Sequence, residues 1–152
     1  MGTATAGFPV KRILVPIDLS EPSKNALRYA LALAQQFGAK LILLYVVEPV
    51  ATHDFDYHPL VLELDKIMAV ARDRLKKLCA QEVVGPSRIE QTLVRNGVAH
   101  GEITDAAKRL RADLIVISTH GRTGLKHVWL GSTAERVVRH AHCPVLVVRA
   151  HV

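Results

Sequence analysis

Five short runs of apolar residues divide the chain, and most of them are continuous rather than alternating. They are Ile13 to Ile17, Leu41 to Val47, Ile89 to Val94, Leu114 to Ser118 and Val145 to Val148. Continuous apolar runs of this length are typical of strands that are buried on both faces of a parallel sheet. The third run is interrupted by Glu90, Gln91 and Thr92, so we expect it to lie nearer an edge of the sheet.

Helical periods lie between these strands, because apolar residues recur there at spacings of three and four. The stripe of the first predicted helix is Leu27, Ala30, Leu31, Ala34 and Phe37, and that of the second is Leu60, Leu64, Ile67, Ala71, Leu75 and Leu78. The third helix carries Ile103, Ala106, Ala107 and Leu110. A long loop from Pro49 to Pro59 precedes the second helix.

The ends of two helices carry capping signals. Ser20 and Pro22 begin the first helix and Gly38 ends it, since serine caps free amides, proline suits a first turn and glycine adopts the left-handed conformation. A fourth helix is predicted to begin with a capping box formed by Ser132 and Glu135 and to run to about His142.

The alternation of strands and helices predicts a single α/β domain with a doubly wound parallel sheet and helices on both faces. Residues 1–9 are expected to form a flexible tail, and residues 10–152 the domain. In such a sheet a ligand binds beyond the carboxyl ends of the strands, where the strand order reverses. Asp18 follows the first strand and the segment from Ser118 to Gly124 contains the end of the fourth, so both are candidates for a site.

Composition excludes several classes of protein. The chain has 152 residues, is 49% hydrophobic and carries a net charge of +6, which excludes general disorder. No uncharged apolar run approaches the ~18 residues that a membrane span needs. Cys79 and Cys143 belong to no CxxC pair, so neither a zinc site nor a disulfide framework is indicated. The basic residues are scattered without aromatic partners, which argues against nucleic acid. The first nine residues do not read as a secretory signal, and we expect a cytoplasmic protein.

The segment from Ser118 to Glu135 contains the most features that could bind a ligand. It combines a glycine-containing turn, the basic residues Arg122 and Lys126, and the start of a helix. Glycines let backbone amides approach a ligand, and helix N-termini offer further donors, so a phosphate group suits this segment. On spacing alone, the glycines could equally serve the turn. The segment is neither a Walker loop nor the GxGxxG fingerprint.

These residues, taken together, resemble the universal stress protein family over nearly the whole chain, from Lys11 to Arg149. The resemblance is carried by Lys11–Ser20, Ala112–Ile117, Thr119–Gly124, Gly131-Ser132 and His142–Val148. It implies a Rossmann-like fold, similar to the adenine nucleotide alpha hydrolases, with the strand order 3-2-1-4-5.

The nucleotide-binding branch of that family has a motif of Gly, two residues, Gly, nine residues, Gly, and then Ser or Thr. Here Gly121 and Gly131-Ser132 match the later positions, whereas Ser118 stands in place of the first glycine. A glycine at that position predicts nucleotide binding and a bulky residue predicts none. Serine is small and can donate a hydrogen bond, so the matter stays open.

The resemblance implies a binding site for ATP or AMP, with any Mg²⁺ arriving with the phosphates. Asp18 would accept from the ribose hydroxyls, the backbone of Val46 would recognise adenine, and the helix start at Ser132 and Thr133 would hold phosphate. The complete set of implied site residues is Pro16, Ile17, Asp18, Val46, Ser118, Thr119, His120, Gly121, Arg122, Thr123, Gly124, Gly131, Ser132 and Thr133.

The family further implies a stress-response regulator or sensor rather than a catalyst, and a homodimer formed through the strand Val145 to Val148. Two alternatives are an adaptor of the same fold that binds no nucleotide, and a slow ATP hydrolase. His120 is a candidate general base, but the sequence identifies neither a nucleophile for it to activate nor a carboxylate to orient it. We therefore interpret His120 as a residue that shapes the loop. His53, Asp54, Asp56 and His58 could hold a metal, but a solvated loop is favoured and no metal site is predicted.

Overall fold

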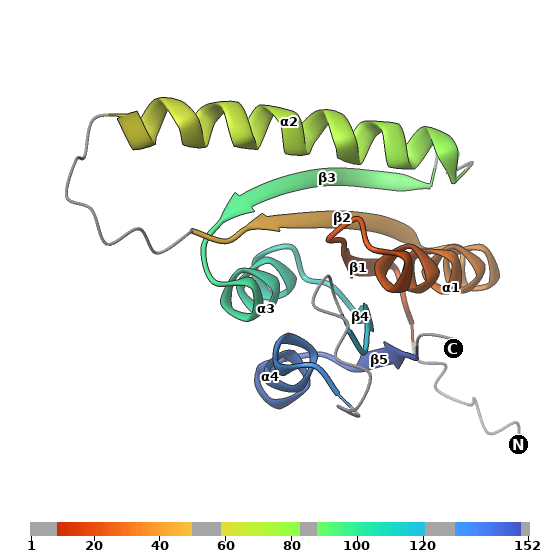
Figure 1. Cartoon of the computed structure of the whole chain (residues 1–152). Coiled ribbons are helices and arrows are strands. Elements are labelled where there is room, and N and C mark those ends of the chain that lie inside the picture. Colours follow the sequence, from red (N-terminus) through yellow and green to blue (C-terminus); the bar gives the residue numbers. More distant parts are fainter. Residues whose placement is uncertain (1–8, 50–58, 83–87, 121–129, 150–152) are drawn as a thin grey trace, which may run out of the picture.

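A computed structural model describes residues 9–49, 59–82, 88–120 and 130–149 of the chain. Its five strands form one parallel sheet of order β3-β2-β1-β4-β5 (Figure 1). The strands are β1 (Arg12–Pro16), β2 (Lys40–Val47), β3 (Ile89–Asn96), β4 (Leu114–Ser118) and β5 (Val145–Val148). The helices are α1 (Glu21–Phe37), α2 (Pro59–Gln81), α3 (Ala99–Arg109) and α4 (Ser132–His140). The predicted α/β fold and strand order are confirmed.

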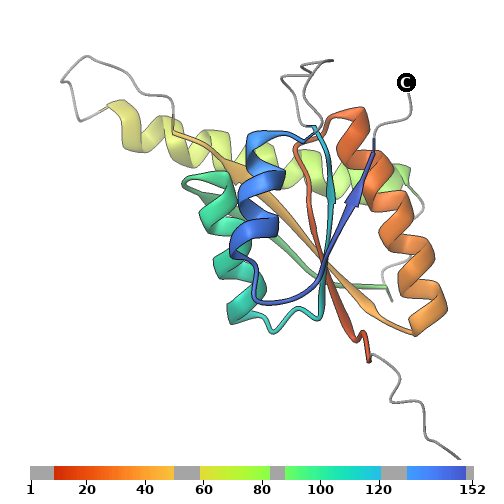
Figure 2. The ribbon, with the colours of Figure 1, turned by 90° about the horizontal axis from the view of Figure 1, so that it is seen from below.

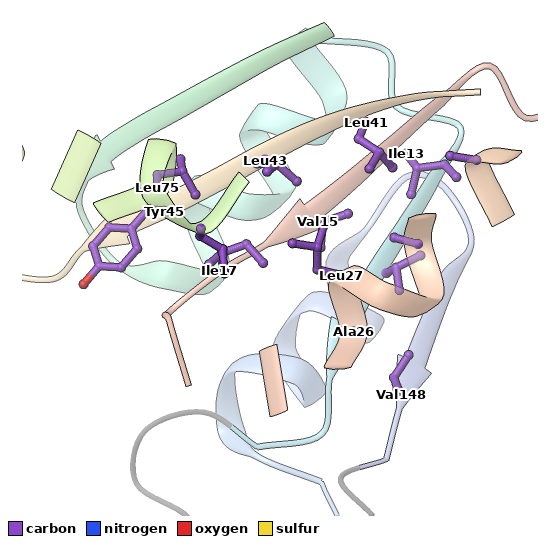
Figure 3. Close-up of a cluster of buried hydrophobic side chains, with 14 of the residues drawn as sticks. Ile13, Val15, Ile17, Ala26, Leu27, Leu41, Leu43, Tyr45, Leu75 and Val148 are labelled. Atoms are coloured by element: carbon purple, nitrogen blue, oxygen red, sulfur yellow. The ribbon is translucent and has the colours of Figure 1, made fainter. Parts of the chain in front are cut away.

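Helices cover both faces of the sheet. Side chains of α1 and α2 pack on one face, and those of α3 and α4 on the other. Figure 3 shows the first of these cores, in which Leu27 of α1 and Leu75 of α2 approach the strands that carry Val15 and Leu43. The central strands are buried on both sides, which is why their sequences are continuously apolar.

The third strand is an edge strand, as its polar residues predicted. Glu90, Gln91 and Thr92 are exposed, and β3 pairs with β2 alone. The other edge is β5, where Leu146 is 37% exposed. The two edges therefore differ in chemistry, since β3 presents polar side chains and β5 is wholly apolar in sequence.

The first helix begins and ends as its capping signals predicted. The Oγ atom of Ser20 accepts a hydrogen bond from the backbone N of Ser23 at 3.3 Å, and a proline stands in the first turn. Gly38 has a φ of 67°, the left-handed conformation that glycine adopts without strain. Local groups of the chain therefore cap both ends of α1.

The capping box predicted for the fourth helix is wrong. Gly131 is the N-cap, and its carbonyl accepts the first helical hydrogen bond from the N of Glu135 at 2.9 Å. Ser132 is therefore the first residue of the helix rather than its N-cap, and Glu135 pairs with Arg139. The helix ends at His140, two residues before the predicted end.

Two residues assigned to apolar stripes are not core residues. Phe37, at the last position of α1, is 48% exposed, and Ile67 of α2 is 51% exposed. Ile67 instead faces a cavity at the end of the sheet. Within the described ranges, no helix combines the length and the hydropathy that a membrane crossing requires. Apart from Pro9, the expected N-terminal tail lies outside the described residues.

Candidate functional site

The strand order reverses at β1, which lies between β2 and β4. Figure 2 shows that α1 and α4 begin at the end of the sheet where β1 and β4 finish. A cavity of about 740 Å³ lies there. It is lined by these predicted site residues: Pro16, Ile17, Asp18, Val46, Ser118, Thr119, His120, Gly131, Ser132 and Thr133. The other predicted members, Gly121, Arg122, Thr123 and Gly124, lie outside the described residues.

The turn between β1 and α1 holds Asp18 at the wall of this cavity. The Oδ1 atom of Asp18 accepts hydrogen bonds from the backbone N of Ser20, at 3.0 Å, and from its hydroxyl. Between them, Leu19 has a φ of 68°, a left-handed conformation that costs energy for a residue with a Cβ atom. The turn is therefore fixed by local hydrogen bonds in a strained form that keeps the carboxylate half-buried beside the cavity.

Ser118 and Thr119, at the end of β4, are buried, and both contact His120. The Ser118 hydroxyl donates to the backbone O of His120 at 2.8 Å, and Nδ1 of His120 lies 3.0 Å from Oγ1 of Thr119. The N–H of Thr119 donates to the backbone O of Val148 at 3.0 Å. The serine that replaces the motif's first glycine thus has a partner within the chain, and His120 takes part in the structure of the loop.

Gly131 brings the far end of the same loop back to the end of β4. Its N–H donates to the backbone O of Thr119 at 2.7 Å. A Cβ atom added at Gly131 would lie 2.7 Å from that same oxygen, closer than real Cβ atoms approach. The φ of Gly131 is −65°, which any residue adopts. The glycine is therefore required by the close approach of two backbone segments and not by its own conformation.

The N-cap of α4 is Gly131, and no side chain in the described part of the chain caps the first amides of this helix. Because the helical ladder begins with the N of Glu135, the N–H groups of Ser132, Thr133 and Ala134 have no partner within the helix. All three residues line the cavity. Together with the positive end of the helix dipole, these amides form a site suited to an anion.

The strand β2 extends beyond β1 and presents its backbone to the cavity. The last ladder pair is Pro16 with Leu44, followed by a hydrogen bond from Ile17 N to Leu44 O at 2.8 Å. On the opposite side, the carbonyl of Val47 accepts from the N of Gly97 at 3.1 Å. Since backbone groups alternate sides along a strand, Val46 directs its N–H and C=O to the side of β1, past the point where that ladder stops.

The sequence did not predict that α2 and Glu48, the residue after β2, would line the cavity. Lys66 and Arg74 line the cavity from α2, on either side of Ile67 and Val70, which are about half exposed. Glu48 lines it as well. No motif marks these residues, and a helical period shows which face of α2 is apolar without showing how far that face extends past the core.

The described residues provide no other obvious reactive centre. They contain no group of three or more His, Cys, Asp or Glu side chains placed to hold a metal ion. The segment with His53, Asp54, Asp56 and His58 lies outside them. Burial raises the pKa of the Cys79 and Cys143 thiols, which keeps both protonated at neutral pH, and neither lines the cavity.

Comparisons with a family model, with related sequences and with solved structures all identify the same family. The family model described as "Universal stress protein family" matches residues 9–149. The universal stress protein MJ0531 of Methanocaldococcus jannaschii is 37% identical over 142 residues, which cover 91% of this chain and 82% of that protein. Among solved structures, a universal stress protein from Lactobacillus plantarum is 34% identical, with a TM-score of 0.81 over 92% of this chain and 98% of its own.

A second solved structure is a universal stress protein in complex with cAMP. It is 26% identical, with a TM-score of 0.59 over 92% of this chain and 97% of its own. The family match, the relatives and the strand order agree over nearly the whole length of the chain. This chain belongs to the universal stress protein family.

Proposed function

We propose that the chain binds an adenine nucleotide, ATP or AMP, in the cavity at the carboxyl ends of β1, β2 and β4. The observation that carries the proposal is the start of α4, where three first-turn amides line the cavity, the N-cap is a glycine, and no side chain among the described residues caps them. A phosphate group supplies the acceptors that such a helix start lacks. The related protein that is described in complex with cAMP supports the choice of an adenine nucleotide.

The other two parts of a nucleotide have counterparts in the same cavity. The N–H and C=O of Val46 form a donor and acceptor pair directed toward the gap beyond β1, and the edge of adenine offers N1 as acceptor and the 6-amino group as donor. The half-buried carboxylate of Asp18 is an acceptor for ribose hydroxyls. Any Mg²⁺ would accompany the phosphates.

We propose a regulatory or sensory role in the stress response rather than catalysis. The bonded pair of His120 and Thr119 supports a structural role for the histidine in the loop. A slow ATP hydrolase predicts release of phosphate above the uncatalysed rate in the presence of Mg²⁺. We expect release at background, and turnover that depends on His120 would contradict this part of the proposal.

The binding proposal is tested by calorimetric titration of the wild type and the Ser118→Gly variant with ATP and Mg²⁺. We expect saturable binding by the wild type, because the Ser118 hydroxyl is already bonded to the carbonyl of His120. Binding by the glycine variant alone would mean that Ser118 obstructs the nucleotide, and would favour the adaptor that binds none. Absence of binding by both proteins would contradict the proposed site.

We also propose that the chain forms a homodimer through β5. This strand is an edge of the sheet, and apolar edge strands pair readily with a second chain. The carbonyls of Pro144 and Val148 accept hydrogen bonds from Ile115 and Thr119, so Val147 turns its N–H and C=O away from β4.

Val147→Pro removes an outward N–H group and leaves the bonds to β4 in place. We expect this variant to sediment as a monomer, whereas Val147→Ala, which keeps the N–H, should remain a dimer. A dimeric Val147→Pro variant would contradict the proposed interface.

A further inference from the structure

Glu48 directly follows β2, and its carboxylate is hydrogen-bonded to the first residue of α3. Its Oε1 atom accepts a hydrogen bond from the backbone N of Ala99, the first residue of α3, at 2.9 Å. The N-cap of α3 is Val98, which makes no side-chain cap hydrogen bond. Glu48 therefore caps α3 from the neighbouring strand, and the bond fixes the position of its carboxylate.

The position of Glu48 follows from the alternation of β2. Ile42, Leu44 and Val46 direct their side chains toward the core formed with α3 and α4. Glu48 continues this series by two residues, and its bond to Ala99 confirms that it lies on the same face. Glu48 and Ala99 both line the cavity, as does Val46. The carboxylate thus stands one step along the strand from the backbone groups assigned to adenine.

We infer that Glu48 selects 6-amino purines over 6-oxo purines at this site, an inference that rests on the proposed binding of adenine nucleotides. The 6-amino group of adenine carries two hydrogens, one for the carbonyl of Val46 and one for the carboxylate of Glu48, directly or through a water molecule. An ionised carboxylate only accepts hydrogen bonds, so both protein groups require a donor at position 6 of the purine.

A 6-oxo purine carries a hydrogen-bond acceptor at position 6, where adenine carries a donor. Hypoxanthine and guanine place an oxygen at position 6, which would face the carbonyl of Val46 and the carboxylate of Glu48 with no hydrogen between them. Sites built to accept a hydrogen bond from a ligand donor reject analogues that lack that donor, because the protein acceptors are then left unpaired. Glu48 is exposed and solvent weakens its hydrogen bonds, so the part of the selectivity due to Glu48 is at most about tenfold.

The test compares the affinities of ATP and ITP, which differ at position 6 and at the adjacent N1, by calorimetry. The proteins are the wild type, Glu48→Gln, and Asp105→Asn as a control that removes one negative charge from an exposed position of α3. The glutamine oxygen can still accept from Ala99, so α3 keeps its cap. We expect Glu48→Gln to reduce the preference for ATP over ITP by up to about tenfold, and Asp105→Asn to leave it unchanged.

The outcomes separate this inference from the proposed function. If the wild type binds ATP and the preference is the same in Glu48→Gln, the inference is overturned and nucleotide binding stands. A lower melting temperature of Glu48→Gln with an unchanged preference would assign Glu48 to the capping of α3 alone. If the wild type binds neither nucleotide, the proposed function fails and the inference fails with it.

Discussion

The helices α1 and α4 begin at the same end of the sheet, but their first amides are satisfied in different ways. At α1, the hydroxyl of Ser20 accepts from the N of Ser23, and Asp18 accepts from the N of Ser20. At α4, the N-cap is Gly131, and none of the side chains that the structure describes caps the first turn. Among the described residues, a side chain caps the start of α1 and none caps the start of α4, which is therefore the start suited to a bound anion.

The two starts also differ in how their turns are held. The turn before α1 is short and is stabilised by the local bonds of Asp18 and Ser20, with Leu19 in a left-handed conformation. The start of α4 is held from outside, because Gly131 donates to the carbonyl of Thr119 at 2.7 Å. Stability at α1 should therefore depend on side chains, and the geometry at α4 on a close backbone contact.

The largest effect is expected from Gly131→Ala. The added Cβ atom would lie 2.7 Å from the backbone O of Thr119, so the start of α4 must move away from β4. Overpacking of this kind costs about 1–3 kcal/mol. We expect thermal unfolding at a lower temperature and loss of ATP binding by calorimetry.

Gly101→Ala is the matched control for this substitution. A Cβ atom at Gly101, inside α3, meets no atom within 4 Å. Alanine is the better helix former, so this variant should gain about 0.5–1 kcal/mol and bind ATP as the wild type does. Equal melting temperatures and equal binding in the two variants would refute the close contact at Gly131.

A smaller effect, on binding alone, is expected from Ser132→Ala. Ser132 is not the N-cap of α4 and lines the cavity at an exposed position, so removal of its hydroxyl should leave the free energy of unfolding within about 0.5 kcal/mol of the wild type. Loss of a hydroxyl that donates to phosphate should lower the affinity for ATP about tenfold. Chemical denaturation and calorimetry measure the two quantities.

Ser20→Ala is the complementary control, because it should lower stability more than it lowers binding. Loss of the cap should cost about 1 kcal/mol of stability, because the N of Ser23 loses its acceptor. The affinity for ATP should fall less than in Ser132→Ala, because Ser20 does not line the cavity and its backbone N still donates to Asp18 after the hydroxyl is lost. If Ser132→Ala instead destabilised the protein as much as Ser20→Ala, the contrast between the helix starts would be wrong.

The fold could be predicted from the sequence, because strands that are buried on both faces of a parallel sheet are continuously apolar. The run Leu41 to Val47 is apolar at every position since helices cover both of its sides. The caps of α1 were equally clear, because Ser20, Pro22 and Gly38 each act through local chemistry.

The start of α4 was harder to predict. Ser132 and Glu135 have the spacing of a capping box, but the contact between Gly131 and Thr119 moves the first helical bond to the glycine. That contact joins residues separated by a loop, so local sequence does not reveal it. The same holds for Lys66 and Arg74, whose place at the cavity depends on how α2 packs across the sheet.

The most direct test of the central claim is an amide-resolved NMR titration of the ¹⁵N-labelled protein with ATP and Mg²⁺. The account predicts saturable shifts of the amide signals of Ser132, Thr133 and Ala134, because phosphate oxygens would accept from these groups. The amide of Ser23, which already donates to Ser20, should shift less. Saturation at other residues with the three α4 amides unmoved would contradict the claim that this helix start holds the phosphate.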